Sequence, residues 1–286
     1  VVVRRTGRLK ESGVRFALNF TVGEDATLED LRAKHDAILI ATGAYKARAL
    51  TCPGGGGRGL VPALDYLTAS NRRGFGETIE DNGRLDASGK RVVVIGGGDT
   101  AMDCVRTAVR QGADAVSCLY RRDRENMPGS AREVKHAEEE GVVFEWLAAP
   151  AAILGDAETA TGVRAQRMQL GAADADGRRR PEPMEGGEFD LDADLVIAAL
   201  GFEPEDLPTL FGAPELRVSP RGTIRTDRRR ETELKGVYAA GDIIRGASLV
   251  VWAVRDGIDA ARSINEDLAA RAEAEAPAAM HAEPAE

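Results

Sequence analysis

The chain has 286 residues, of which 43% are hydrophobic, and its formal net charge is −9 at pH 7. This length is too great for one typical α/β domain and suits two domains with separate cores. The acidic balance argues against nucleic acid as a partner, because phosphate recognition needs a basic surface. The sequence has no apolar run of membrane-spanning length and no signal-peptide pattern, so we expect a cytoplasmic protein without a membrane partner.

The cysteines Cys52, Cys104 and Cys118 are odd in number and include no Cys-x-x-Cys pair. This pattern favours reduced thiols and excludes both a dithiol redox centre and a self-contained iron–sulfur site. His136 has no metal-ligand partner nearby in the sequence, so we interpret it as a surface residue and predict no metal site. The chain starts with Val1 rather than Met, which suggests a fragment or a processed chain.

The amino-terminal part contains alternating strand and helix patterns. Val14–Phe20 alternates apolar with other residues and predicts a strand, and Thr27 with Asp30 fits the capping box of a following helix. Ala37–Ile40 predicts another strand, which leads directly into Ala41-Thr42-Gly43. Small residues at the carboxyl end of a strand allow close approach of a ligand, although an ordinary turn is an open alternative.

A glycine-rich stretch, Cys52–Gly59, has no periodicity and predicts a crossover between two domains. Val61–Asn71 has apolar residues at helical spacing and predicts a helix. Residues 72–89 predict a polar loop.

The central pattern combines a strand, a glycine turn, a helix and a second strand. Arg91–Ile95 is a β-branched run typical of a buried parallel strand, and Ala115–Tyr120 predicts the second strand. Between them a helix is predicted up to Gly112. The turn fits Gly-x-Gly-x-x-Ala, in which the glycines allow a tight turn and close approach of backbone to a pyrophosphate. Its residues are Gly96, Gly97, Gly98, Asp99, Thr100 and Ala101.

The residues after the second strand indicate which nucleotide binds. An acidic residue there would accept hydrogen bonds from the ribose of NAD, but the chain has Arg121 and Arg122. Guanidinium groups suit a 2′-phosphate, so we predict NADP(H). A carboxylate at Asp99 would repel phosphate, and we interpret that residue mainly as a favourable first-turn residue of the helix.

Beyond Arg122 the sequence predicts a helix followed by strands. Ser130 and Glu133 fit a capping box that opens a helix ended by Gly141. The segments 142–147 and 163–170 predict strands, the second of them antiparallel, and a polar loop around 178–183 predicts a hairpin.

The carboxyl-terminal part returns to strand and helix patterns. Predicted strands are 195–200, 223–226 and 237–240, a predicted long helix is 248–268, and 269–286 has the Ala/Glu/Pro composition of a disordered tail. Gly241 and Asp242 follow the third of these strands, which places a carboxylate at its carboxyl end.

Several of these motifs occur together in a known family. They are Gly96 to Asp103 (Gly-Gly-Gly-Asp-Thr-Ala-Met-Asp), Tyr120-Arg121-Arg122, Asn126-Met127-Pro128-Gly129-Ser130, Ala240-Gly241-Asp242 and Ser248-Leu249-Val250-Val251-Trp252-Ala253. By these residues the chain resembles the small (beta) subunit of NADPH-dependent glutamate synthase, over nearly all of residues 1–268.

The resemblance implies an α/β fold of two Rossmann-like nucleotide-binding domains, with an NADPH domain inserted into an FAD domain. Residues 1–55 and 203–268 would form the FAD domain, and residues 56–202 the NADPH domain. The first FAD fingerprint and the amino-terminal cysteine segment of the family are absent from this sequence. The FAD domain is therefore expected to be incomplete, and 4Fe-4S clusters are expected only in a missing amino-terminal segment.

The resemblance also implies roles for particular residues. Gly96 to Ala101 would hold the NADP pyrophosphate, and Arg121 and Arg122 the 2′-phosphate. The FAD contacts would be Ala41, Thr42, Gly43, Gly241 and Asp242, with Ser248, Leu249 and Val250 at a helix amino end that faces the flavin. No catalytic residue is predicted, because flavin and nicotinamide supply the chemistry.

The implied function is transfer of electrons from NADPH through FAD to iron–sulfur clusters and a large subunit that makes glutamate. Two alternatives stay open: a related NADPH:acceptor flavoprotein subunit with another partner, and a non-catalytic NADP-binding module.

Overall fold

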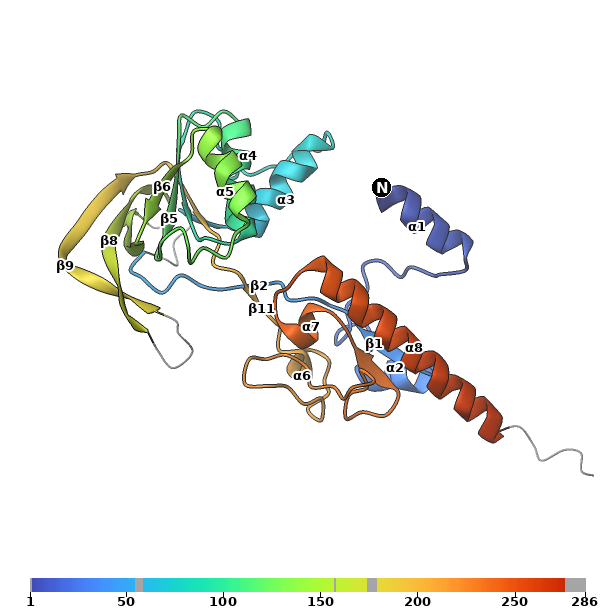
Figure 1. Cartoon of the computed structure of the whole chain (residues 1–286). Helices are drawn as coiled ribbons and strands as arrows, with labels where there is room; N and C mark the ends of the chain where they lie inside the picture. Colours follow the sequence, from blue (N-terminus) through green and yellow to red (C-terminus); the bar gives the residue numbers. More distant parts are fainter. Residues whose placement is uncertain (1, 55–58, 157, 174–178, 276–286) are drawn as a thin grey trace, which may run out of the picture. The chain divides into compact units, whose positions relative to one another are not determined.

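The computed structural model describes residues 2–54, 59–156, 158–173 and 179–275, which form two compact units (Figure 1). Unit 1 consists of Val1–Lys46 and Phe202–Glu286, and unit 2 is the continuous stretch Ala47–Gly201. The sequence predicted the boundaries between the two domains at 55/56 and 202/203. Residues after Lys46 belong to unit 2 because their backbone bonds there: the Arg48 amide donates to the Gly201 carbonyl (3.1 Å) and the Pro53 carbonyl accepts from the Ile153 amide (2.9 Å).

Within the described residues, unit 2 is built on a five-stranded parallel sheet of order β3-β10-β4-β5-β6. The strands are β3 (Leu60–Pro62), β4 (Arg91–Ile95), β5 (Ala115–Tyr120), β6 (Val143–Trp146) and β10 (Leu195–Ala198). The chain runs from β4 outward to β6 and returns to the other side of β4 at β10. The strand order therefore reverses between β4 and β10, which is where such sheets bind nucleotides.

Alternate residues of the central strand β4 face two different cores. Val92 and Val94 pack with α3 (Ala63–Gly74), α4 (Asp99–Arg110) and α5 (Ala131–Glu139), which lie beside the sheet in Figure 1. Val93 and Ile95 pack with the second sheet of unit 2. Burial of both faces explains why β4 has a continuous apolar sequence without alternation.

The second sheet of unit 2 is antiparallel and consists, in the described part, of β7 (Ala148–Gly155), β8 (Ala160–Ala173) and β9 (Arg179–Asp192). The predicted antiparallel strand and hairpin are confirmed by β8 and β9. The predicted polar loop 178–183 is wrong for residues 179–183, which belong to β9, and β7 was not predicted; residues 174–178 lie outside the described residues. Most of β9 is exposed, so its composition is polar although its backbone pairs with β8.

Two helix predictions in unit 2 need correction. The helix predicted from Val61 begins instead at Ala63, because residues 60–62 pair with β10 as strand β3. The capping box at Ser130 is also wrong: Ser130 makes no side-chain cap bond, and the Glu133 carboxylate accepts from Arg106 on α4. An ion pair between helices has replaced the local cap.

Unit 1 has a small parallel sheet in which β1 (Ile38–Ile40) pairs with β12 (Val237–Ala239). Ile40 and Ala239 are partners in the register, so segments far apart in the chain end at the same edge. The core beside them includes Leu28 of α2 (Leu28–Lys34), Leu207 of α6 (Leu207–Leu210) and Ile243 of α7 (Asp242–Arg245). The capping box of α2 is confirmed: Thr27 and Asp30 bond reciprocally.

The other elements of unit 1 are α1 (Val2–Glu11), β11 (Phe202–Glu203) and the long helix α8 (Val250–Glu275), while β2 (Lys46–Ala47) contains the boundary between the units. β2 and β11 pair where the chain passes between the units. Helix α8 continues beyond residue 268, so residues 269–275 are helical rather than a disordered tail. Alanine, glutamate and arginine favour helices, which explains the extension; residues 276–286 lie outside the described residues.

Two strand predictions in unit 1 are wrong. Val14–Phe20 forms no strand, and its apolar residues stay exposed, with Leu18 at 79%. Alternation alone cannot form a strand when no neighbouring strand accepts its backbone bonds. Thr223–Thr226 has only an isolated bridge between Val218 and Ile224.

Candidate nucleotide-binding sites

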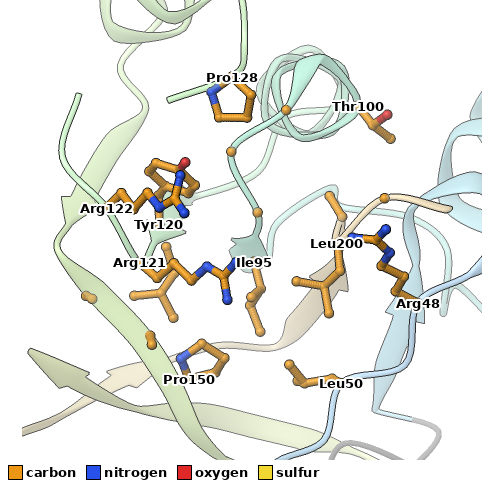
Figure 2. Close-up of a pocket in the computed structure, with 18 of the residues that line it drawn as sticks. Arg48, Leu50, Ile95, Thr100, Tyr120, Arg121, Arg122, Pro128, Pro150 and Leu200 are labelled. Atoms are coloured by element: carbon orange, nitrogen blue, oxygen red, sulfur yellow. The ribbon is translucent and has the colours of Figure 1, made fainter. Parts of the chain in front are cut away.

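A cavity of about 660 Å³ in unit 2 opens at the carboxyl ends of β4 and β10, the point where the strand order reverses. The glycine turn after β4 and residues 199–201 after β10 line it, as do Arg121 and Arg122 after β5 (Figure 2). The cavity therefore brings the predicted turn and the predicted arginines together.

The three glycines of the turn differ in what limits them. A Cβ at Gly96 would lie 2.2 Å from the Ala199 carbonyl oxygen, and one at Gly97 would lie 2.3 Å from ring carbons of Tyr120. Gly96 also has a φ of +151°. A Cβ at Gly98 would meet nothing within 4 Å. The first two glycines are thus required by packing within the protein, whereas Gly98 leaves open space in which a ligand can approach the backbone.

Helix α4 begins directly at this turn. Its N-cap residue is Gly98, so no side chain caps the first amides of the helix, and Thr100 lines the cavity. Free amides and the helix dipole favour an anion at this end. Ala101 is fully buried and allows the helix to pack closely. The Asp99 carboxylate accepts a hydrogen bond from the Ser130 amide (2.8 Å), so its interactions are structural.

The two arginines lie on one side of the cavity. Figure 2 shows the guanidinium of Arg121 reaching toward Ile95 and that of Arg122 beside the ring of Tyr120. Arg122 Nε is buried and has no hydrogen-bond partner among the described residues. A buried donor without a partner is costly, and a bound anion would satisfy it. The Tyr120 hydroxyl donates to the Asn126 carbonyl (2.9 Å) and holds the loop that follows the arginines.

The opposite wall of the cavity was missed by sequence reasoning. Arg48 and Leu50 line it, together with Pro150 of β7 and Leu200 after β10 (Figure 2). Arg48, Leu50 and Pro150 lie in segments for which no element was predicted, and Leu200 is the last residue of the predicted strand 195–200. For Arg48 and Leu50 the only sequence signal was their position just before the predicted crossover.

The predicted FAD contacts all lie in unit 1. Ala41-Thr42-Gly43 follows β1 and Gly241-Asp242 follows β12, and the Ala240 amide donates to the Ile40 carbonyl (3.0 Å). Because β1 and β12 are parallel neighbours, the two segments meet at one carboxyl edge. The Asp242 side chain is half-buried.

The start of helix α8 approaches the same edge, since a Cβ on Gly241 would lie 3.5 Å from Ala253 Cβ. Ser248 and Leu249 precede the helix, and Val250 is its first residue. All three are exposed, with Leu249 at 60% and Val250 at 77%. The structure thus gathers the predicted flavin-contacting residues in one region of unit 1.

Of the three thiols, Cys52 lines the cavity in unit 2, and Cys104 and Cys118 do not. Cys104 and Cys118 are buried, and burial raises the pKa of both, that of Cys118 to about 12. Cys52 lines the cavity, and partial burial raises its pKa as well.

Within the described ranges, no group of three or more His, Cys, Asp or Glu side chains is placed to hold a metal ion. Also among the described residues, no helix has the length and apolar character that crossing a membrane requires.

Comparison with known proteins decides the family. The family described as pyridine nucleotide-disulphide oxidoreductase matches residues 6–257. The chain belongs to the pyridine nucleotide-disulphide oxidoreductase family. It is similar in fold to Mycobacterium tuberculosis FprA, solved in complex with NADPH, with a TM-score of 0.72 and 21% identity over 90% of this chain and 69% of FprA. The predicted α/β fold with two Rossmann-like units is therefore confirmed.

Two curated relatives are much closer in sequence. The chain is 64% identical over 271 residues to the putative glutamate synthase [NADPH] small chain of Cereibacter sphaeroides, covering 94% of this chain and 65% of the relative. It is 60% identical over 286 residues to the glutamate synthase [NADPH] small chain of Azospirillum brasilense, covering 99% and 59%. These identities confirm the predicted resemblance. The chain spans less than two thirds of the length of these relatives.

Proposed function

We propose that this chain is the NADPH-oxidising part of a flavoprotein subunit that passes electrons from NADPH through FAD to iron–sulfur clusters and a large subunit for glutamate synthesis. The observation that carries the NADPH part is the cavity in unit 2. It combines an uncapped helix amino end with Arg121 and Arg122, and Arg122 Nε is a buried donor without a protein partner among the described residues.

These residues fit NADPH in a defined way. The uncapped start of α4, which follows Gly98, would hold the pyrophosphate, because that end of the helix favours negative charge. The guanidinium groups of Arg121 and Arg122 would bind the 2′-phosphate with charge-assisted hydrogen bonds. An NADH molecule lacks this phosphate and would leave the Arg122 donor unsatisfied.

The residues of unit 1 fit part of an FAD site. When bound, FAD would accept hydride from NADPH and release electrons singly to an acceptor. Asp242 would accept hydrogen bonds from the ribityl or pyrophosphate region, Ala41-Thr42-Gly43 would allow close approach of backbone, and the start of α8 would favour negative charge on the flavin. The clusters and the large subunit rest on the resemblance, and the relatives' description as a small chain supports a larger partner. The cytoplasmic location is proposed from the sequence.

The test is a comparison of NADPH and NADH affinities in Arg121→Gln and Arg122→Gln variants, measured by calorimetry or fluorescence titration. We expect the double variant to lose roughly 2 to 4 kcal/mol of NADPH binding and little NADH binding. Arg132→Gln, at an exposed arginine of α5 outside the cavity, is the matched control. Equal losses for the two nucleotides would contradict the assignment of the arginines to the 2′-phosphate.

A non-catalytic NADP-binding module is the second candidate, because the cavity in unit 2 forms from one continuous unit without unit 1. Flavin absorbance separates the two functions. A bound-flavin spectrum that NADPH bleaches supports the flavoprotein subunit, whereas tight NADPH binding to a chain that does not bind added FAD supports the module.

A further inference from the structure

A second polar cavity, of about 450 Å³, lies wholly in unit 1 and shares no residue with the nucleotide cavity of unit 2. Its walls come from residues 223–226, from Arg230 and from the carboxyl end of α7. Three of the lining residues are arginines: Arg225, Arg230 and Arg245. Two threonines, Thr223 and Thr226, add hydroxyl groups.

One buried carboxylate fixes two of these arginines. Asp256 on α8 is fully buried; Arg230 Nη2 lies 2.5 Å from its Oδ1, and Arg245 Nη2 lies 2.7 Å from the same oxygen. The two guanidinium groups hold the pKa of Asp256 below its ordinary value, with Arg245 the larger cause. Asp256 therefore stays charged and orders two cations, while it neutralises only one of them.

The third arginine adds to this positive excess. Arg225 is exposed, and its guanidinium has no ion pair or hydrogen bond with the described residues. The other facing carboxylate is Asp259, whose Oδ2 lies 3.7 Å from Arg230 Nη2 and which also pairs with Arg255. Around the cavity, the cationic groups therefore outnumber the carboxylates that compensate them.

Arg230 has two further unusual features. Its φ is +66°, a left-handed conformation that is uncommon for a residue other than glycine and that tends to occur at functional sites. Its Nε is buried and has no hydrogen-bond partner among the described residues. A buried donor without a partner is costly, so the contacts within unit 1 alone leave the arrangement of this arginine incompletely satisfied.

We propose that this cavity of unit 1 binds a phosphate-class oxyanion, held by the guanidinium groups of Arg225, Arg230 and Arg245 that line it. The tetrahedral oxygens of such an anion match several guanidinium donors at once, which a planar apolar ligand or a cation does not. The inference rests on the geometry of unit 1 and does not depend on the proposed function. The anion is either free in solution or part of a nucleotide.

The test is a calorimetric titration of the full chain with inorganic phosphate, in a background carrying Arg121→Gln and Arg122→Gln so that the unit 2 cavity contributes little. Arg225→Gln should weaken phosphate binding by about tenfold or more, because one charge-assisted contact is lost. Arg228→Gln, an exposed arginine of the same segment outside the cavity, is the matched control and should change affinity by less than about twofold.

Arg230→Lys is the second variant, since it keeps a cation opposite Asp256 but lacks the guanidinium fork that can bind an oxyanion with two donors. It should also weaken phosphate binding by about tenfold, while hydrogen exchange in unit 1 without phosphate stays as in the parent. Displacement of phosphate by FAD would assign the anion to a nucleotide, and unchanged binding would assign it to a free ion. Equal affinities in Arg225→Gln and Arg228→Gln, or no saturable binding at millimolar phosphate, would overturn the proposal.

Discussion

The two units present candidate ligand residues at the same place, the carboxyl edge of parallel strands, but they build that edge differently. In unit 2 the strand, turn, helix and next strand follow one another from Arg91 to Tyr120, within a sheet covered on both faces. In unit 1 the edge joins Ile38–Ile40 to Val237–Ala239. A site made from one continuous stretch forms with its own unit, whereas a site made from distant stretches depends on their pairing.

The units also differ in what stabilises them. Among the described residues, unit 2 has an apolar core on each face of its sheet. The described part of unit 1 has an apolar core beside its small sheet, the buried carboxylate Asp256, and many large apolar side chains in solvent. The exposed ones include Val14, Phe16, Leu18, Phe20, Leu39, Leu249, Val250, Val251, Trp252, Val254 and Ile258. We therefore expect polar contacts to account for more of the stability of unit 1 than of unit 2.

The largest expected effect follows from removing the charge of Asp256. Asp256→Asn leaves Arg245 without its carboxylate partner and Arg230 with only the longer contact to Asp259, and should destabilise unit 1 by about 3 kcal/mol at neutral pH. Hydrogen exchange followed by mass spectrometry should show faster exchange in peptides of unit 1 only, with NADPH affinity unchanged. An equal increase of the exchange rates in both units would contradict the inference that Asp256 stabilises unit 1 alone.

The same substitution has a predicted pH dependence. The pKa of Asp256 is lowered in the folded chain, so the carboxylate stabilises unit 1 above its ordinary pKa of 3.8 and this contribution is lost as the pH falls through the lowered value. The difference in exchange between wild type and Asp256→Asn should therefore be complete near neutral pH and shrink in acid. A difference that grows in acid would contradict the ion-pair explanation.

The next effect concerns unit 2, where substitution of two glycines of the same turn should have different consequences. Gly96→Ala places a Cβ 2.2 Å from the Ala199 carbonyl oxygen and should destabilise unit 2 by roughly 2 kcal/mol. Gly98→Ala meets no protein atom within 4 Å, so stability should stay nearly constant while NADPH affinity falls. Thermal unfolding and NADPH titration of both variants measure this. Similar stability losses would mean that neither glycine is reserved for the ligand.

The smallest effect concerns the local cap of α2 in unit 1. Thr27→Ala removes the side chain that accepts from the Asp30 amide (3.1 Å) and should cost about 1 kcal/mol. Ser130→Ala in unit 2 is the matched control, because Ser130 makes no side-chain cap bond. Exchange rates in the α2 and α5 peptides would show the difference, and equal changes in the two variants would refute it.

Much of the molecule could be predicted from the sequence because the relevant interactions are local. Continuous apolar runs predicted strands β4 and β5 with the bounds that the structure has. The Thr27 and Asp30 pair gave the cap of α2 because its hydrogen bonds span a few residues. The turn from Gly96 to Ala101 and the arginines after β5 were recognisable because backbone conformation and charge are fixed by residue type.

The predictions that failed concern segments whose structure depends on partners far away in the chain. Residues 14–20 have a strand pattern but no pairing strand among the described residues, and Glu133 fits a capping box but bonds to Arg106 on another helix.

Only the tertiary structure decided three features. It brought Arg48 and Pro150 to the cavity of unit 2, joined Ala41-Thr42-Gly43 to Gly241-Asp242 at one edge, and placed Arg225, Arg230 and Arg245 around a second cavity. The sequence alone determined where the glycine turn lies, because the pattern of strand, glycines and helix is continuous in the chain. The meeting of distant residues is set by sheet pairing and burial, which no local pattern contains.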